Sequence, residues 1–510
     1  MTIVGFSRRT ILFGVAATVL AGCGGGAAGS PLALPNGFSL HRHTGSSPIQ
    51  HVVIIVQENR SFNNLFAGFP GANDTMAGKE KVKKGGKWVD KPVKLTEQAL
   101  LPTPKNHDIG HCYYSFIAAY DGGKMDGFNY EPEGICQRKW SGGGGLPSTY
   151  PYQYVNPTDI APYWDMAEQY VLADAMFQTQ GSGSFSAHQD LIRGGTALAG
   201  PYGSSASMID TPTLYPWGCD APKPTVTNLI TLKLKWESDT GPYPCTEDFP
   251  YSGSTTYTTL ADLLDSAGVS WKYYSPCFIG TPSSAECPSS EEGCKGCAGA
   301  ELNAFDVIAS VRYGKEWGTN VDMPETNVLN DISNGALPAV SWVIPNDTDD
   351  DHLGEKEDNG PSWVASVVNA VGQSSYWNST AIVILWDDWG GLYDNAAPPC
   401  LSKSQCRDDQ GGLGFRVPMI VVSPYAKVGQ TSQSGYVSHT QYEFGSILKY
   451  VEQNFGLTVG GLETTDNRAA SISDVFDYNQ KPRKFTVIPS QHDARWFIAH
   501  RPALSHGDPE

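Results

Sequence analysis

Two short polar clusters in the sequence have the residue types of a metal site. Glu58 and Asn59 follow the apolar run HVVIIVQ, and Asp387 and Asp388 follow the apolar run AIVILW. Each cluster therefore places two oxygen ligands at the end of a segment with the composition of a buried strand. If the two strands are neighbours, the four side chains converge, and carboxylates packed so closely need a cation or strongly shifted pKa values. Two independent surface turns would explain the same residues.

A Gly- and Ser-rich turn could supply a nucleophile. The segment QGSGSFSAHQ places Ser182, Ser184 and Ser186 just before a helix that we expect to begin near Ala187. The free backbone N–H groups of a helix N-terminus favour an anion, and a serine at that point could attack phosphorus. An ordinary Ser/Gly N-cap would account for the same residues.

Two further segments carry groups that could transfer protons or hold an anion. The segment HDIGHCYYSFIAAYDGGKMDGF offers His107, His111, Lys124 and Asp126. In PNDTDDDH, His352 follows an expected strand that ends at Ile344. A structural role is the ordinary explanation for a lone histidine.

The elements that must position these groups alternate along the chain. Strand-like runs are expected at Gln50–Val56, Tyr170–Ala173, Val269–Tyr274, Ala339–Ile344, Ala381–Trp386 and Val417–Val422. Helical patterns lie between several of them, at residues 257–268, 303–314, 362–374 and 442–456. This alternation predicts an α/β fold whose mostly parallel sheet is covered by helices on both faces. Reactive groups of such sheets gather outside the carboxyl ends of the strands, where both polar clusters fall.

Composition limits the partners and the number of domains. The 510 residues are 40% hydrophobic, which is enough for a large packed core, and the formal charge of −18 would repel nucleic acid. The basic segment KEKVKKGGKWVDKPVK is better explained as an exposed hairpin around its Gly-Gly turn. We expect one catalytic domain over residues 48–500, with a Cys-rich insertion at about 201–301, and no internal repeat.

The N-terminus has the pattern of an export signal. Arg8 and Arg9 precede a short apolar stretch that resembles a twin-arginine signal, and LAGC resembles a lipobox. These resemblances predict a signal peptide at residues 1–23, acylation of Cys23, and a flexible linker at residues 24–47. The protein would then be a periplasmic or cell-surface lipoprotein attached to the membrane through its lipid. A cleaved signal that releases soluble, secreted protein is the alternative.

Cysteine usage agrees with export. Apart from Cys23 there are ten cysteines, an even number that suits disulfides in an oxidising compartment. Cys112 with Cys136, and Cys400 with Cys406, are plausible loop staples. The remaining cluster of Cys277, Cys287, Cys294 and Cys297 has the spacing of a zinc knuckle, but disulfides explain it better.

Several of these motifs resemble one known family. HVVIIVQENRSFNNLF, GSFSAHQ, WDDWGGLYD and SHTQYEFGSILKYVEQNFGL occur in the order seen in the bacterial phosphoesterases, the family of phospholipases C and respiratory-burst-inhibiting acid phosphatases. The resemblance covers roughly Gln50 to Tyr478. It implies an alkaline-phosphatase-like α/β fold and the hydrolysis of phosphoric esters.

The resemblance also implies roles for individual residues. Glu58, Asn59, Asp387 and Asp388 would bind a metal ion, Ser184 would be the nucleophile, and His111 and His352 would lie near the leaving group. All-oxygen ligands favour a hard divalent ion such as Ca²⁺, Mg²⁺ or Mn²⁺. Arg60 or Lys124 would help to hold phosphate oxygens.

The chain departs from the family pattern at two places, and the substrate stays open. Many members have Asp-His where this chain has Asp394 and Asn395, and proline where it has Gly183 and Ser186. The substrate would be a phosphate monoester or the phosphodiester of a lipid headgroup. A sulfatase-like hydrolase of the same fold and a non-catalytic surface-binding lipoprotein are the alternatives. The sequence indicates no oligomeric state.

Overall fold

The computed structural model describes most of the chain after residue 46. The described residues are 47–102, 106–131, 149–198, 208–214, 217–221, 225–231, 235–241, 245, 257–278, 298–299, 302–399, 413–430 and 435–500. The expected signal peptide, residues 24–46 of the linker, and the cysteines at seven of the positions singled out above lie outside them: Cys23, Cys136, Cys287, Cys294, Cys297, Cys400 and Cys406. In the part of the chain that the structure describes, no helix has both the length and the apolarity to cross a membrane.

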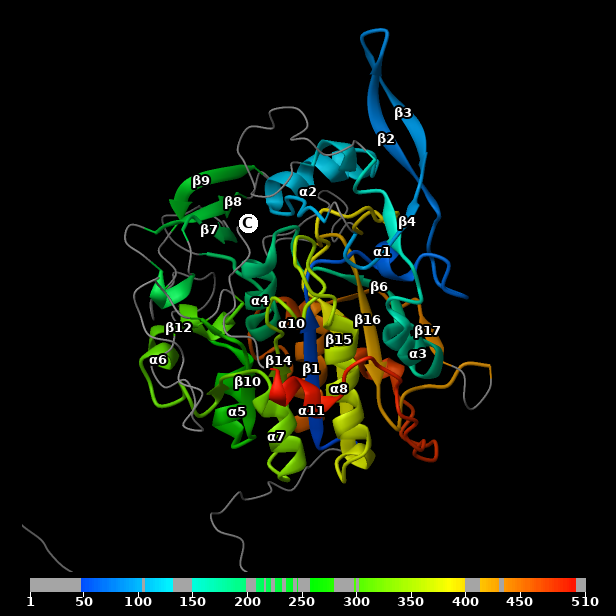
Figure 1. Ribbon diagram of the computed structural model, residues 1–510. Helices are drawn as coiled ribbons and strands as arrows, with labels where there is room; N and C mark the ends of the chain where they lie inside the picture. The colour runs from blue at the N-terminus through cyan, green and yellow to red at the C-terminus, as the bar shows by residue number, and fades with distance from the viewer. Residues whose placement is uncertain are drawn as a thin grey trace, which may run out of the picture. The chain divides into compact units, whose positions relative to one another are not determined.

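A nine-stranded sheet forms the centre of the fold (Figure 1). Its path runs through β13 (Val321–Asp322), β10 (Trp271–Tyr274), β14 (Val340–Val343), β1 (His51–Gln57), β15 (Thr380–Trp386), β16 (Arg416–Val422), β6 (Val171–Phe177) and β17 (Tyr436–Ser438). The ninth strand, β18 (Tyr442–Glu443), also pairs with β6. Among these strands, β16 alone runs antiparallel to its neighbours. The predicted α/β class with a mostly parallel sheet is confirmed.

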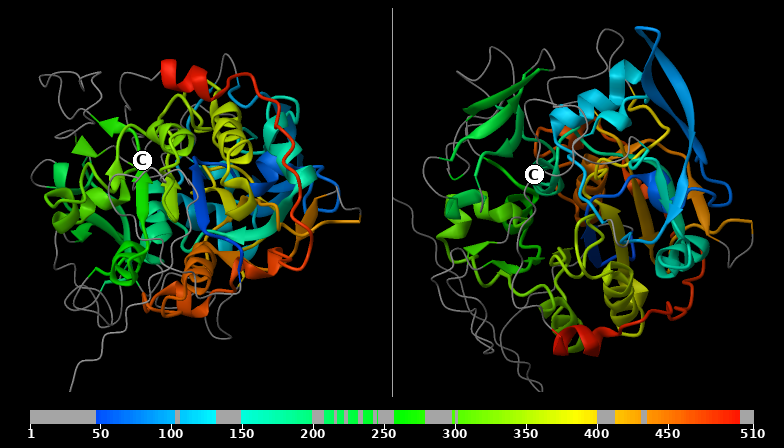
Figure 2. Two further views of the ribbon diagram at one scale, coloured as in Figure 1. Left: turned by 90° about the horizontal axis from the view of Figure 1, so that it is seen from below. Right: turned by 45° about the horizontal axis from the view of Figure 1, so that its top comes forward.

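Helices cover both faces of the sheet, which explains the continuous apolar runs of its central strands. One face carries α3 (Ala161–Gln169), α7 (Asn327–Ser333), α8 (Gly360–Gly372) and α11 (Ala494–Ala499). The other carries α4 (Ser184–Arg193), α5 (Leu260–Ala267), α9 (Phe444–Phe455) and α10 (Thr465–Arg468). The left view of Figure 2 shows the sheet between α8 and α11 above and α9 and α10 below.

The register of β1 and β15 positions the two polar clusters. Ile55 pairs with Ile384 and Gln57 with Trp386, so both strands end at the same level. The pairing continues one step further, because the Asp387 N–H donates to the Gln57 carbonyl over 2.9 Å. Glu58 and Asp387 therefore leave the sheet side by side.

Two sequence-based boundaries need correction. Residues 303–314 form a 3-10 turn (Ala304–Val307) and a short helix α6 (Ala309–Arg312) instead of one helix. The range 201–301 is too wide for an insertion, since α5 and β10 belong to the core. Only its first part forms a separate three-stranded sheet of β7 (Met208–Pro212), β8 (Thr227–Ile230) and β9 (Trp236–Gly241).

Three cysteines of the described chain are disulfide-bonded. Cys219 is bonded to Cys245, a pair that the sequence did not single out. Cys112 is also disulfide-bonded, but its expected partner Cys136 lies outside the described residues, so this pairing stays a prediction. A two-stranded sheet consists of β11 (Cys277–Phe278) and β12 (Ala298–Gly299).

Smaller elements surround the carboxyl end of β1. The helices are α1 (Phe62–Phe66) and α2 (Tyr113–Tyr120), and β4 (Thr96–Gln98) pairs with β5 (Gln153–Val155). The expected hairpin is confirmed as β2 (Ala77–Lys84) and β3 (Lys87–Lys94). Gly85 and Gly86, with φ of 58° and 78°, form its turn, because a two-residue hairpin turn of this kind needs positive φ at both positions.

Candidate active site

The structure brings Glu58, Asn59, Asp387 and Asp388 together at the carboxyl ends of β1 and β15. None of the four is more than 2% exposed. Asn59 has a φ of 59°, a left-handed conformation that asparagine tolerates better than most residues. Its backbone N–H donates to Asp387 Oδ1 over 3.1 Å, which fixes one cluster against the other.

The Gly-Gly pair after the aspartates is required by this close approach. Gly390 has a φ of 59°, and a Cβ built on it would lie 2.1 Å from the Asn59 carbonyl oxygen. Any larger residue would therefore push the two loops apart. The glycine also donates its N–H to Asp388 Oδ1 over 2.7 Å, which holds that carboxylate in place.

Ser184, the first residue of α4, points at the same cluster. Its Oγ lies 3.2 Å from Asn59 Oδ1 and 3.2 Å from Asp388 Oδ2, and the residue is fully buried. The other two serines of the turn make different contacts. Ser182 Oγ accepts from Gln180, and Ser186 Oγ donates to the carbonyls of Ile209 and Asp210.

His188 is a member of the cluster that sequence reasoning missed. Its Nε2 lies 3.0 Å from Glu58 Oε1 and 3.8 Å from Asp387 Oδ2. A signal for it existed, because residues four apart lie on the same face of a helix and His188 is four residues after Ser184. Glu58, His188 and Asp387 together could hold a metal ion.

The Asn59 amide tests whether these residues fit a cation. Its Oδ1 lies 3.1 Å from Glu58 Oε2, 2.9 Å from Asp387 Oδ1 and 3.2 Å from Ser184 Oγ, so it faces other oxygens. Asp387 Oδ2 is buried and accepts no hydrogen bond from any residue that the structure describes. Such a convergence of oxygens is the arrangement that a hard cation satisfies. In the opposite orientation, the amide nitrogen would donate to these oxygens instead.

His111 and His352 lie on the other side of the Asn59 amide. The Nε2 atoms of the two rings are 3.1 Å and 2.7 Å from the amide nitrogen, and the ring centroids are 5.7 Å apart. His111 Nδ1 donates to the Ile109 carbonyl over 2.7 Å, which leaves Nε2 to face the cluster. Asp108, His111 and His352 form a second group that could hold a metal ion.

Burial governs the charges of the cluster. It raises the pKa of Glu58 well above the ordinary value, with Asp387 and Asp350 adding repulsion. It lowers the pKa of His188 to about 4, although the neighbouring Asp387 acts in the opposite direction. Among the described basic side chains, His188 alone lies within 4 Å of the Glu58 and Asp387 carboxylates, and it is neutral at pH 7. No protein cation therefore offsets these two carboxylates in the described part of the chain.

The two residues suggested for phosphate binding do not join this cluster. Arg60 is buried, and its guanidinium donates to the carbonyls of Asp351 and Leu100 and to Asn64 Oδ1. Lys124 pairs with Asp121 over 2.8 Å, and its side chain is 60% exposed. Arg60 holds neighbouring loops together, and Lys124 lies at the surface.

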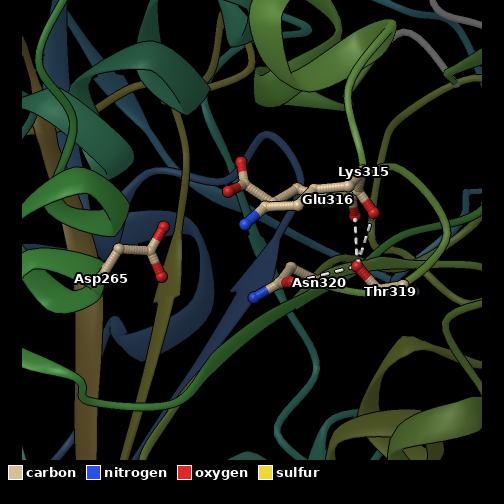
Figure 3. A pocket seen from close by; sticks show the side chains of 5 residues that line it. All are labelled: Asp265, Lys315, Glu316, Thr319 and Asn320. Atoms are coloured by element: carbon tan, nitrogen blue, oxygen red, sulfur yellow. Dashed lines mark hydrogen bonds between the residues drawn. The ribbon is translucent and has the colours of Figure 1, made fainter.

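A surface recess elsewhere has none of these features. It is lined by Asp265, Lys315, Glu316, Thr319 and Asn320 (Figure 3). Asn320 donates to the carbonyl of Trp271, the first residue of β10, so the recess lies near the amino end of that strand. Parallel α/β sheets bind ligands at the opposite, carboxyl end.

Comparison with known proteins decides the family. The profile of the Phosphoesterase family matches residues 49–458, which is most of the chain. The chain belongs to the phosphoesterase family. This membership agrees with the family resemblance of the sequence motifs.

Curated relatives of this phosphoesterase include bacterial phospholipases C. It is 25% identical to a non-hemolytic phospholipase C of Burkholderia pseudomallei, over 88% of this chain and 62% of the relative. It is also 25% identical to phospholipase C A of Mycobacterium tuberculosis, over 94% of this chain and 87% of the relative. The chain thus spans less than two thirds of the length of the first relative.

Solved structures resemble the phosphoesterase only weakly. Ps i-CgsB matches with a TM-score of 0.34 and 11% identity, over 85% of this chain and 77% of that one. A protein of the alkaline phosphatase superfamily from Vibrio parahaemolyticus matches with a TM-score of 0.31 and 10% identity, over 81% and 67%. Scores this low add nothing to the family assignment.

Proposed function

We propose that the protein is an exported, metal-dependent phosphoesterase that hydrolyses phosphate esters through a phosphoserine at Ser184. The observation that carries this proposal is the position of Ser184 Oγ, 3.2 Å from both Asn59 Oδ1 and Asp388 Oδ2. A hydroxyl at that point can attack phosphorus while the first N–H groups of α4 face the phosphate oxygens. Family membership supports the reaction type.

Glu58, Asn59, Asp387 and Asp388 would hold the metal ion, with His188 Nε2 in contact with Glu58. A divalent ion bound there lowers the pKa of a nearby hydroxyl and neutralises charge on phosphate. For this, the chain must hold the carboxylates of the two clusters close together. The paired ends of β1 and β15 and the Asn59–Asp387 hydrogen bond do so.

His111 and His352 would move protons at their Nε2 atoms. One ring would donate to the departing alkoxide, and a neutral ring would later accept a proton from the water that hydrolyses the phosphoserine. Both Nε2 atoms now contact the Asn59 amide, so a donating ring must exchange that contact for one with the substrate.

The relatives favour a lipid headgroup diester over a small monoester. Their names identify phospholipases C, enzymes that act on phospholipids. Export as a lipoprotein is supported by Arg8, Arg9 and the LAGC sequence ahead of the catalytic domain. A lipid substrate and a lipid anchor would place the enzyme and its substrate at the same surface.

A paired assay tests the proposed function. Purified protein is incubated with a soluble phosphate monoester and with a soluble phosphorylcholine diester, before and after chelation and metal restoration. We expect faster release from the diester, loss of turnover on chelation and recovery with one of Ca²⁺, Mg²⁺ or Mn²⁺. Faster product release from the monoester would indicate a phosphatase. No product from either substrate would favour the alternative of a non-catalytic binding protein.

A further inference from the structure

The hairpin of β2 and β3 is cationic in a protein that is otherwise acidic. Residues 77–94 contain seven lysines and two acidic residues, a surplus of five positive charges, whereas the chain as a whole carries −18. The hairpin forms its own two-stranded sheet and projects from the body (Figures 1 and 2). At about 3.4 Å per residue, its eight-residue strands measure about 27 Å.

The outer part of the hairpin combines free lysines with exposed apolar side chains. Every residue from Lys83 to Pro92 is exposed, including Trp88 at 51% and Val89 at 37%. Lys83 lies 5.1 Å from the centre of the Trp88 ring on the opposite strand. A tryptophan flanked by lysines is typical of protein segments that lie at a membrane–water interface.

The charges at the tip reduce the stability of the hairpin itself. Lys84 and Lys87 pair directly across the two strands, and like charges at such positions destabilise a hairpin. Lys81 and Lys91 have acidic partners in Asp121 and Glu80, but Lys83, Lys84 and Lys87 pair with no acidic residue that the structure describes. An external anion would relieve this repulsion.

The base of the hairpin is fastened to the active-site loop. A Cβ on Gly78 would lie 2.6 Å from the Tyr393 ring, and Val93 belongs to the same buried cluster as Trp389 and Tyr393. Trp389 directly follows the site residue Asp388 and donates to the His111 carbonyl. The hairpin therefore projects from the end of the sheet that carries the active site.

We propose that the β2–β3 hairpin docks the enzyme on anionic phospholipid bilayers, with Lys83, Lys84 and Lys87 on headgroup phosphates and Trp88 at the interface. The proposal rests on the proposed function in one respect, because it names the lipid surface where that function is exerted. At about 0.1 M salt, charges more than about 10 Å apart are largely screened from each other. The projecting hairpin can therefore reach the bilayer while the acidic body is screened from the anionic lipids.

A charge-matched pair of variants tests the proposal. The hairpin variant carries Lys83→Gln, Lys84→Gln and Lys87→Gln, and it should fold because it removes the repulsion at the tip. The control carries Lys315→Gln, Lys481→Gln and Lys484→Gln, three lysines that are also exposed. Each full-length protein is mixed with vesicles of phosphatidylcholine, with or without phosphatidylglycerol, and bound protein is measured by sedimentation.

We expect wild type and control to bind only the vesicles with phosphatidylglycerol, and high salt to release them. Because each lysine near an anionic surface strengthens binding several-fold, the hairpin variant should bind roughly 100-fold more weakly. Equal binding by both variants, equal binding to neutral vesicles, or binding to heparin or nucleic acid but not to vesicles would overturn the proposal. Turnover of a soluble substrate, measured in parallel, should be the same in all three proteins, and its absence would count against the proposed function alone.

Discussion

Glu58 is the residue at which charge and the proposed metal binding would be most directly coupled. Burial and the carboxylate of Asp387 raise its pKa, so without a cation it retains a proton at pH values where an ordinary glutamate has lost it. His188 cannot compensate, since burial lowers its pKa to about 4 and the imidazole is neutral at pH 7. A cation that enters the site must therefore displace a proton.

The first prediction is that chelated protein becomes less stable as the pH rises, and that bound metal removes this loss. For an acid whose folded pKa is raised, the penalty is absent below the unfolded value of about 4.5 and grows as pH rises through the folded pKa. Thermal unfolding from pH 4.5 upward, with chelator and with metal, measures it. Glu58→Gln should flatten the curve of the chelated protein; an unchanged curve would contradict the coupling.

The second prediction concerns His188, whose ring contacts the Glu58 carboxylate. Replacement by Phe removes the 3.0 Å contact and should weaken metal affinity by about 10- to 100-fold, the usual effect of losing a partner that orients a ligand. Calorimetric titration of the chelated protein measures the affinity. His439→Gln, at a more exposed histidine that contacts Asp174, is the control and should not change it. Equal affinities in both variants would remove His188 from the site.

The third prediction separates Ser184 from Ser182, a second serine of the same turn. Ser184→Ala should lower turnover by at least about 10³-fold while metal binding and fold persist, because the proposed nucleophile is lost. Ser182→Ala should cost far less, since that hydroxyl contacts Gln180 and not the acidic cluster. Peptide mapping after trapping the phosphoenzyme gives a second measure. Near-normal turnover in Ser184→Ala would make a water molecule the attacking group.

At the level of secondary structure, the ends of the strands could be predicted from the sequence, whereas the pairing of the strands could only be assumed. The apolar runs before Glu58 and Asp387 predicted β1 and β15 to within one residue, because strands buried on both faces must be apolar. The pairing of these two strands was an assumption that the structure bears out. His188 and the structural role of Arg60 were not predicted, because both depend on contacts between segments more than 30 residues apart.

Asp394, which precedes the departure from the family pattern at Asn395, is another residue whose contacts the sequence did not predict. In the structure it connects the loop after β15 to its neighbours. Its carboxylate accepts from Arg416 on β16 and from the backbone N–H of Asn63 on α1. Asn395, at the position of the family histidine, also accepts from Arg416 over 2.8 Å. The position thus serves to anchor the loop between β15 and β16.

The fourth prediction tests this anchor. Asp394→Asn keeps the shape of the side chain but leaves the buried Arg416 guanidinium without its carboxylate, and it should cost about 3 kcal/mol of unfolding free energy. Denaturant unfolding with metal present measures the loss. Lys124→Gln, which breaks an exposed ion pair, should leave the midpoint nearly unchanged. If Asp394→Asn unfolds at the same midpoint as wild type, the pair does not anchor the loop.

For the whole molecule, the distribution of charge matters more than its sum. A formal charge of −18 opposes any approach to an anionic membrane, while the surplus of lysines is concentrated on one projecting hairpin. A polybasic segment and a covalent lipid act together in membrane attachment, because each alone binds weakly or reversibly. The proposed acylation of Cys23 and the proposed docking hairpin would be two such signals in one chain.

The last prediction separates the two signals. If Cys23 is acylated, mass spectrometry of the mature protein should find it as the modified N-terminal residue. Cys23→Ala should then move the protein from the membrane fraction to the soluble fraction when cells are broken at high salt, because salt screens the lysines of the hairpin. The triple lysine variant of the hairpin, with Cys23 intact, should stay in the membrane fraction under the same conditions. An unmodified terminus downstream of Cys23 would contradict the anchor, and vesicle binding would then depend on the hairpin alone.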